Sequence, residues 1–71
     1  MIMEETKRQK FQRLAEARTN RIIEQLDILG NLSNRSNYEY TPEEVNKIFR
    51  SIERALRRVE RQFEDPNDFT L

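Results

Sequence analysis

The most clearly marked helix in the sequence begins at Thr41-Pro42-Glu43-Glu44. A threonine N-cap accepts a hydrogen bond from the backbone three residues later, and a glutamate at that later position accepts one from the threonine backbone. Proline suits the first helical position, because its φ is already helical and its missing N–H has no partner there. The pattern predicts a capped helix start, with Tyr40 and Val45 placed to form a hydrophobic staple.

Apolar residues after this start recur at helical spacing. Steps of three and four place them on one face about 100° wide. The set consists of Val45, Ile48, Phe49, Ile52, Leu56, Val59 and Phe63. Pro66 disfavours helical backbone at the preceding residue. We therefore expect a helix over about 42–64 and a loose tail over 65–71.

A second helical pattern precedes this one. Its apolar residues lie along one stripe and are Phe11, Leu14, Ala15, Ile22, Leu26 and Leu29. Gly30 follows them, where a left-handed C-terminal cap favours glycine. The pattern predicts a helix over about 4–29 and a polar loop over 30–41. The candidate core of an oligomer consists of Phe11, Leu14, Ile22 and Leu26 of this stripe and all seven apolar residues of the later one.

The loop and the residues after it resemble a known pattern. Gly30 to Thr41 reads GNLSNRSNYEYT, and it is followed by Glu44-Val45 and Lys47-Ile48-Phe49. This string is similar to the loop of short uncharacterised bacterial and phage proteins. Together with the basic first helix, the similarity covers most of the chain. It implies a helical hairpin and no particular activity.

Length and composition favour assembly. The chain has 71 residues, of which 35% are apolar and 37% charged, enough for one small domain. Two antiparallel helices leave both sides of their contact exposed to solvent. One core of this size contributes only about 3–5 kcal/mol to the stability of the fold. We predict an all-α protein, an antiparallel two-helix hairpin that forms a four-helix bundle as a homodimer. The alternative is a monomeric hairpin closed by its tail.

The residue inventory argues against catalysis. The chain has no cysteine, no histidine and one glycine. It therefore lacks disulfides, the commonest general base and metal ligand, and glycine-rich phosphate loops. We expect no enzyme activity, metal or cofactor. No apolar run approaches the roughly 20 residues of a membrane span, and Glu4-Glu5 is unlike a signal peptide, so we expect a cytoplasmic protein without a membrane partner.

A net charge of zero conceals a strong segregation of charge. Residues 7–21 hold six bases and one acid, a net of +5, and residues 47–61 hold six bases and two acids, a net of +4. Residues 22–46 hold five acids and one base, a net of −4. In a hairpin the two basic segments would lie at the open end.

Arginines of the second helix form a ridge at steps of four, three and four. The arginine ridge consists of Arg50, Arg54, Arg57 and Arg61. Arginine forks suit phosphate and carboxylate, so the ridge predicts an anionic partner, a nucleotide or a nucleic acid. The sequence pI of about 6.3 is low for a nucleic-acid-binding domain. The alternative is a solvated face whose arginines pair with Glu53, Glu60 and a partner chain.

Two further places are candidate binding sites. Arg18 lies inside the first apolar stripe. One interpretation is that its aliphatic stem packs on the core while its guanidinium reaches the edge. The other is that its guanidinium faces a central anion or fixes the register of the helices in an oligomer. The loop offers polar side chains next to a helix N-terminus. The loop candidates are Asn34, Arg35, Ser36, Asn37 and Tyr38.

Two function classes follow. The first is an oligomeric binding protein that captures an anion through the arginine ridge, the loop or both. The second is a structural or adaptor protein that acts through helix–helix assembly with itself or with a protein partner.

Overall fold

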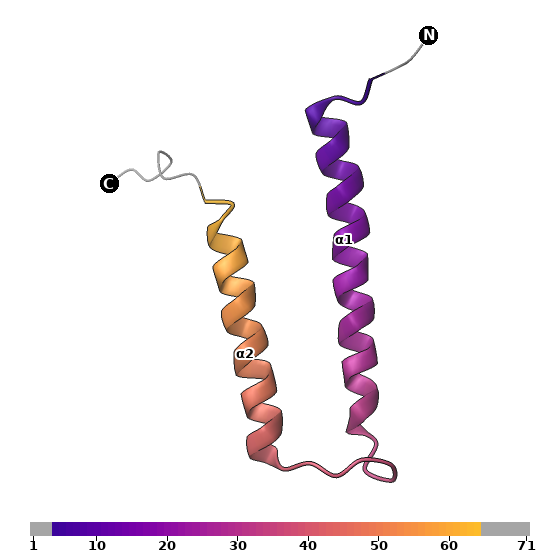
Figure 1. Cartoon of the computed structure of the whole chain (residues 1–71), viewed down its shortest axis with the longest axis vertical. Coiled ribbons are helices and arrows are strands. Elements are labelled where there is room, and N and C mark those ends of the chain that lie inside the picture. Colours follow the sequence, from indigo (N-terminus) through magenta and orange to yellow (C-terminus); the bar gives the residue numbers. More distant parts are fainter. Residues whose placement is uncertain (1–3, 65–71) are drawn as a thin grey trace, which may run out of the picture. The chain divides into compact units, whose positions relative to one another are not determined.

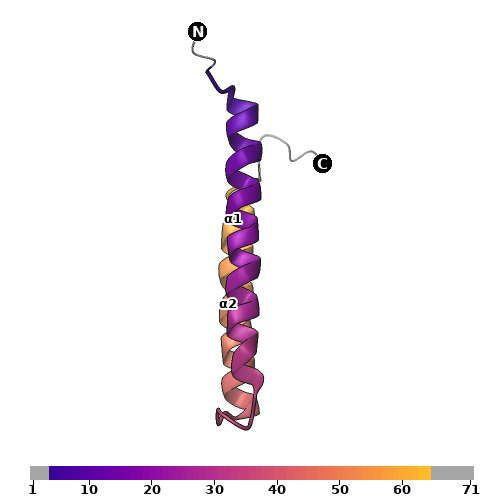
Figure 2. The same ribbon diagram turned by 90° about the vertical axis from the view of Figure 1, so that its right-hand side faces the viewer.

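The computed structural model describes residues 4–64, and in that range the chain is all-helical. The elements are α1 (Lys7–Gly30), the 3₁₀ turn η1 (Asn31–Ser33) and α2 (Pro42–Arg61) (Figure 1). No strand occurs in the described range, so the predicted all-α class is confirmed. The chain divides into two units, one ending at Tyr38 and the other starting at Glu39. Neither helix shows a visible kink in Figure 1, and α1 shows none in the perpendicular view either (Figure 2).

The helix α1 starts three residues later than the sequence pattern predicts, because Thr6 is its N-cap. The Thr6 hydroxyl accepts a hydrogen bond from the Gln9 backbone N–H at 3.0 Å. The Gln9 side chain accepts one from the Thr6 backbone N–H at 2.9 Å. Together they form a capping box that satisfies backbone donors left without partners at a helix start. Glu4 and Glu5 therefore lie outside the helix.

The prediction of a left-handed cap at Gly30 is wrong. Gly30 belongs to α1 and has a φ of −60° and a ψ of −26°, which are right-handed helical values. The following Asn31 is helical as well, and its N–H is shared among the carbonyls of Asp27, Ile28 and Leu29. The chain tightens into η1, so the last carbonyls of α1 gain partners without a change of handedness.

The start of α2 confirms the sequence prediction. The Glu44 N–H donates to the Thr41 hydroxyl at 3.1 Å, and the Thr41 N–H donates to Glu44 Oε1 at 2.8 Å. Pro42 takes the first helical position. Tyr40 and Val45, the predicted staple, are both half-buried.

The end of α2 falls at Arg61, three residues before the predicted limit. Hydrogen bonds from the backbone N–H groups of Gln62, Phe63 and Glu64 reach back only three residues, to Val59, Glu60 and Arg61. This tighter bonding ends the α-helical geometry before Pro66 is reached. The predicted tail, 65–71, lies outside the described residues.

Within residues 4–64 no side chain is fully buried. Of the candidate core residues, Leu14, Val45 and Ile52 are half-buried, as are Ala15 and Leu29 of the α1 stripe. The others are exposed, among them Ile22 at 62%, Leu56 at 65% and Phe63 at 74%. The remaining exposed members are Phe11, Leu26, Ile48, Phe49 and Val59. Both helices thus present apolar stripes that their own turns do not cover, and the oligomer core stays a prediction.

Candidate functional site

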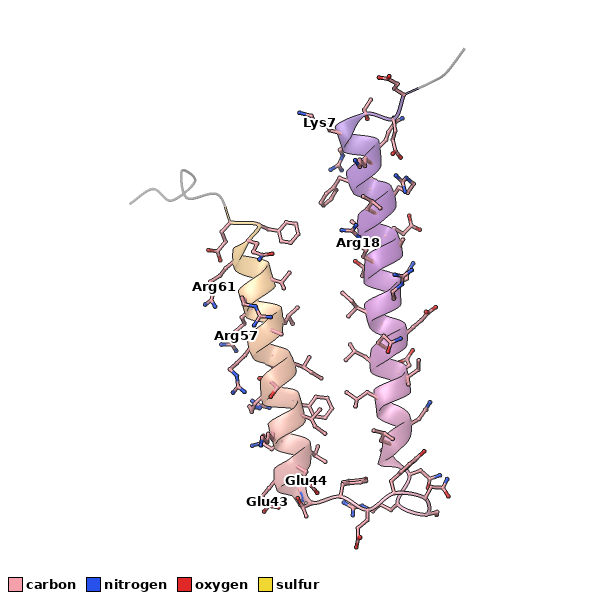
Figure 3. The ribbon with its side chains drawn as sticks, in the orientation of Figure 1. Lys7, Arg18, Glu43, Glu44, Arg57 and Arg61 are labelled. Atoms are coloured by element: carbon pink, nitrogen blue, oxygen red, sulfur yellow. The ribbon has the colours of Figure 1, made fainter. Side chains whose placement is uncertain are left out.

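The arginine ridge of α2 is the leading candidate site. At 3.6 residues per turn, its four members lie on the side of α2 opposite the apolar stripe. Arg57 and Arg61 extend from the same side of the helix (Figure 3). A surface that covers the stripe therefore leaves the ridge accessible.

The first half of the ridge makes local contacts. Arg50 Nη1 lies 3.1 Å from Oε2 of the half-buried Glu53, one turn away. Arg54 Nη2 donates to the Ser51 hydroxyl at 3.3 Å. A solvent-accessible ion pair of this kind is weak, so Glu53 offsets the positive charge of Arg50 only in part. The Ser51 hydroxyl is uncharged, so its contact does not offset the positive charge of Arg54.

The second half of the ridge is unpaired within the described residues. Neither Arg57 nor Arg61 forms an ion pair with any acid between residues 4 and 64. Arg61 lies in the last turn of α2, where the helix dipole favours a cation, and Glu43 and Glu44 lie in the first turn, where it favours anions. The charge distribution along α2 therefore stabilises the helix, and no acid within residues 4–64 pairs with Arg57 or Arg61.

Arg18 is exposed on α1, and no ion pair forms at its guanidinium within residues 4–64 (Figure 3). Its position inside the apolar stripe follows from its spacing of four from both Leu14 and Ile22. Both interpretations of Arg18 stay predictions, because each depends on what covers the stripe.

The loop candidates come together in one turn, and Asn34 holds that turn in place. The Asn34 carbonyl accepts hydrogen bonds from the backbone N–H groups of Asn37 at 3.1 Å and Tyr38 at 3.0 Å. Its side-chain oxygen accepts a third from the Ser36 N–H, also at 3.0 Å. Asparagine favours such turns. Asn34 thus has a structural role, whereas the Tyr38 ring is 47% exposed.

Sequence spacing missed an ion pair at the start of α1. Arg13 Nε and Nη2 lie 2.8 and 2.9 Å from the two carboxylate oxygens of Glu5, a two-pronged pairing. The hydrogen bond from Arg13, with its positive charge, lowers the pKa of the Glu5 carboxyl, and Glu5 raises the pKa of Arg13. Glu5 precedes the helix, so the helical spacing of three or four does not reveal the pair. Nearby, the Arg8 guanidinium lies 6.0 Å from the centre of the Phe11 ring.

No set of three or more carboxylates gathers closely enough to hold a metal ion anywhere in residues 4–64. Neither helix of the described part has the length and apolar character needed to cross a bilayer. Comparison with known proteins gave no matching family model, no matching curated protein and no matching solved structure.

Proposed function

We propose that this chain is a non-enzymatic, self-assembling helical protein that binds nucleic acid through the arginine ridge of α2. The main support is that Arg57 and Arg61, one turn apart, have no ion-pair partner among residues 4–64 and lie opposite the apolar stripe. The helices pair as an antiparallel hairpin, and two hairpins form a four-helix bundle. In that bundle the stripes face inward and the ridge faces outward.

The length of the ridge favours a polyanion over a single nucleotide. Arg50 and Arg61 are eleven residues apart, so the ridge is about 16 Å long at 1.5 Å per residue. One phosphate group meets only one or two arginine forks, whereas a strand with successive phosphates meets the whole ridge. The polar turn at Asn34–Tyr38 is a second, separate surface for polar contacts.

The test is fluorescence anisotropy with labelled single-stranded DNA and RNA oligonucleotides at low salt. The variant Arg57→Gln/Arg61→Gln should weaken binding about tenfold or more, because two charge-assisted contacts are lost. The matched control is Lys7→Gln/Arg8→Gln, which removes the same charge from the basic start of α1, off the ridge, and should weaken binding less than the ridge variant does. Affinity should fall steeply with salt, with a smaller slope in the ridge variant.

Three results would overturn this proposal. The first is a wild type that binds neither oligonucleotide at low salt. The second is an equal loss of affinity in the ridge variant and its control, which would indicate nonspecific electrostatic attraction. The third is full competition by a free nucleotide at the same affinity, which would indicate a mononucleotide site.

A structural or adaptor role is the second candidate, and the exposed stripes favour it. Leu56 in α2, Phe63 just after α2 and Ile22 in α1 show most of their surface to solvent. Exposed apolar faces of this kind mark interaction surfaces. Light scattering separates the candidates: an oligomer that forms without ligand and binds no nucleic acid supports the adaptor role.

A further inference from the structure

A second face of α1 has the spacing of a helix–helix contact. Its members recur at steps of three, four, three and four, as the core positions of a coiled coil do. This face, the α1 flank, consists of Leu14, Ala17, Arg21, Glu24 and Ile28. It is centred about a third of a turn away from the apolar stripe of α1. Leu14 belongs to both faces, so a helix packed on the stripe leaves most of the flank open.

The α1 flank has no partner within the unit that contains it. Ile28 is 57% exposed, and Ala17, Arg21 and Glu24 are exposed as well. Neither Arg21 nor Glu24 forms an ion pair within residues 4–64. The flank therefore offers apolar surface at both ends and two unpaired, opposite charges at its centre.

The chemistry of the flank is complementary to itself when reversed. Its midpoint falls between Ile22 and Ile23, with Arg21 and Glu24 equally far from it on either side. Ala17 and Ile28 are the next members outward, again at equal distances. A second copy in the antiparallel direction would place Arg21 opposite Glu24 twice, and the small Ala17 opposite the large Ile28 twice. A parallel copy would place Arg21 against Arg21 and Glu24 against Glu24, which is repulsive.

We propose that the α1 flank binds a second copy of this chain, with the two α1 helices antiparallel about the midpoint between Ile22 and Ile23. This rests on the self-assembly part of the proposed function and adds the contact face, direction and register. The distribution of charge along α1 agrees with it, because residues 7–21 are strongly basic and the acids Glu24 and Asp27 follow. Two central charged layers fix register at some loss of stability, as polar residues do in coiled-coil cores.

Charge reversal tests the contact. In the antiparallel pair, Arg21→Glu creates two Glu–Glu contacts and Glu24→Arg creates two Arg–Arg contacts. Each variant alone should raise the dimer dissociation constant about tenfold, measured by analytical ultracentrifugation. An equimolar mixture of the two should restore wild-type affinity, since every contact is then Glu–Arg, and so should the double reversal Arg21→Glu/Glu24→Arg. Glu16→Arg, at an exposed position off both faces, is the matched control and should leave dissociation unchanged.

Disulfide trapping tests the direction. The chain has no cysteine, so Ala17→Cys and Ile28→Cys each introduce one thiol. When the two variants are mixed and oxidised, the Ala17→Cys/Ile28→Cys heterodimer should predominate over both symmetric species, as read by intact mass. A predominant symmetric Ala17→Cys dimer would mean parallel helices and would overturn the proposal.

The outcomes also separate this proposal from the one on which it rests. A wild type that stays monomeric at every concentration overturns both self-assembly and the flank contact. A wild-type dimer that neither charge reversal weakens leaves self-assembly standing and overturns the flank contact alone.

Discussion

At the scale of single residues, the two threonine N-caps have the most clearly defined stabilising role. The Thr41 hydroxyl accepts a hydrogen bond from the Glu44 backbone N–H, a donor that otherwise has no partner within the helix. We predict that Thr41→Ala lowers the free energy of unfolding by about 1 kcal/mol. Thr41→Ser keeps the hydroxyl and should retain most of that stability. Thermal unfolding followed by circular dichroism measures both, and equal losses in the two variants would contradict a capping role.

The Glu5–Arg13 pair predicts a dependence on pH. Because Arg13 lowers the folded-state pKa of Glu5, the pair stabilises the start of α1 at pH values above the ordinary carboxyl pKa of 4.5. That contribution is lost as the pH falls through the lowered folded-state pKa. In an NMR titration, Arg13→Gln should return the Glu5 pKa toward its ordinary value. The opposite direction, or no change on substitution, would show that the pair does not form in solution.

At the scale of the helical elements, Gly30 gives a direct test of how α1 ends. Its φ is right-handed, and a Cβ built there meets no atom within 4 Å. Alanine loses less backbone entropy than glycine in that conformation, so Gly30→Ala should stabilise the protein by about 0.5–1 kcal/mol. Chemical denaturation measures the change. Destabilisation would instead indicate a left-handed cap, in which a Cβ is strained.

The sequence predicts the start of α2 better than it predicts either boundary of α1. The reason is that the signals for the start of α2 all lie within one turn of the chain. Thr41, Pro42 and Glu44 define the start of α2 within one turn, so that boundary could be predicted. The same signal exists at Thr6 and Gln9, in its glutamine form, and a predicted start at about Glu4 does not take it into account. The end of α1 depends on backbone hydrogen bonds that Asn31 makes after Gly30, and residue preferences do not encode these.

The sequence predicts where the candidate site lies, but it does not determine which of its arginines form ion pairs. Helical spacing alone places the arginine ridge on one side of α2. Helical spacing offers Glu53 and Glu60 as partners of the ridge arginines, but which arginine pairs with which acid depends on side-chain rotamers. Within residues 4–64 only Arg50 of the ridge pairs, and its partner is Glu53. The Glu5–Arg13 pair depends on the path of the chain before α1, which the helical period does not describe.

At the scale of the whole molecule, the exposed stripe of α2 predicts a strong effect of truncation. Leu56 is 65% exposed on its own helix, and assembly would bury it. Leu56→Ala should then cost roughly 2–5 kcal/mol of stability and shift light scattering toward the 8.7 kDa species.

The control for Leu56 is Ile23→Ala. Ile23 is 51% exposed but lies outside the stripe and the α1 flank, so its truncation should change stability by only about half a kcal/mol. Equal effects of the two substitutions would mean that assembly does not discriminate between these faces, and the stripe would lose its role as the core.

The two capping boxes also bear on folding kinetics. Each box closes over three residues, at Thr6–Gln9 and at Thr41–Glu44, so neither helix start waits for a distant contact. Short-range structure of this kind forms within about a microsecond, whereas the meeting of separate chains is slower and depends on their concentration. For a chain that buries its stripes only on assembly, collision between partly helical chains becomes the slow step. Its refolding rate then rises with protein concentration, and at high dilution the helices persist only as transient segments.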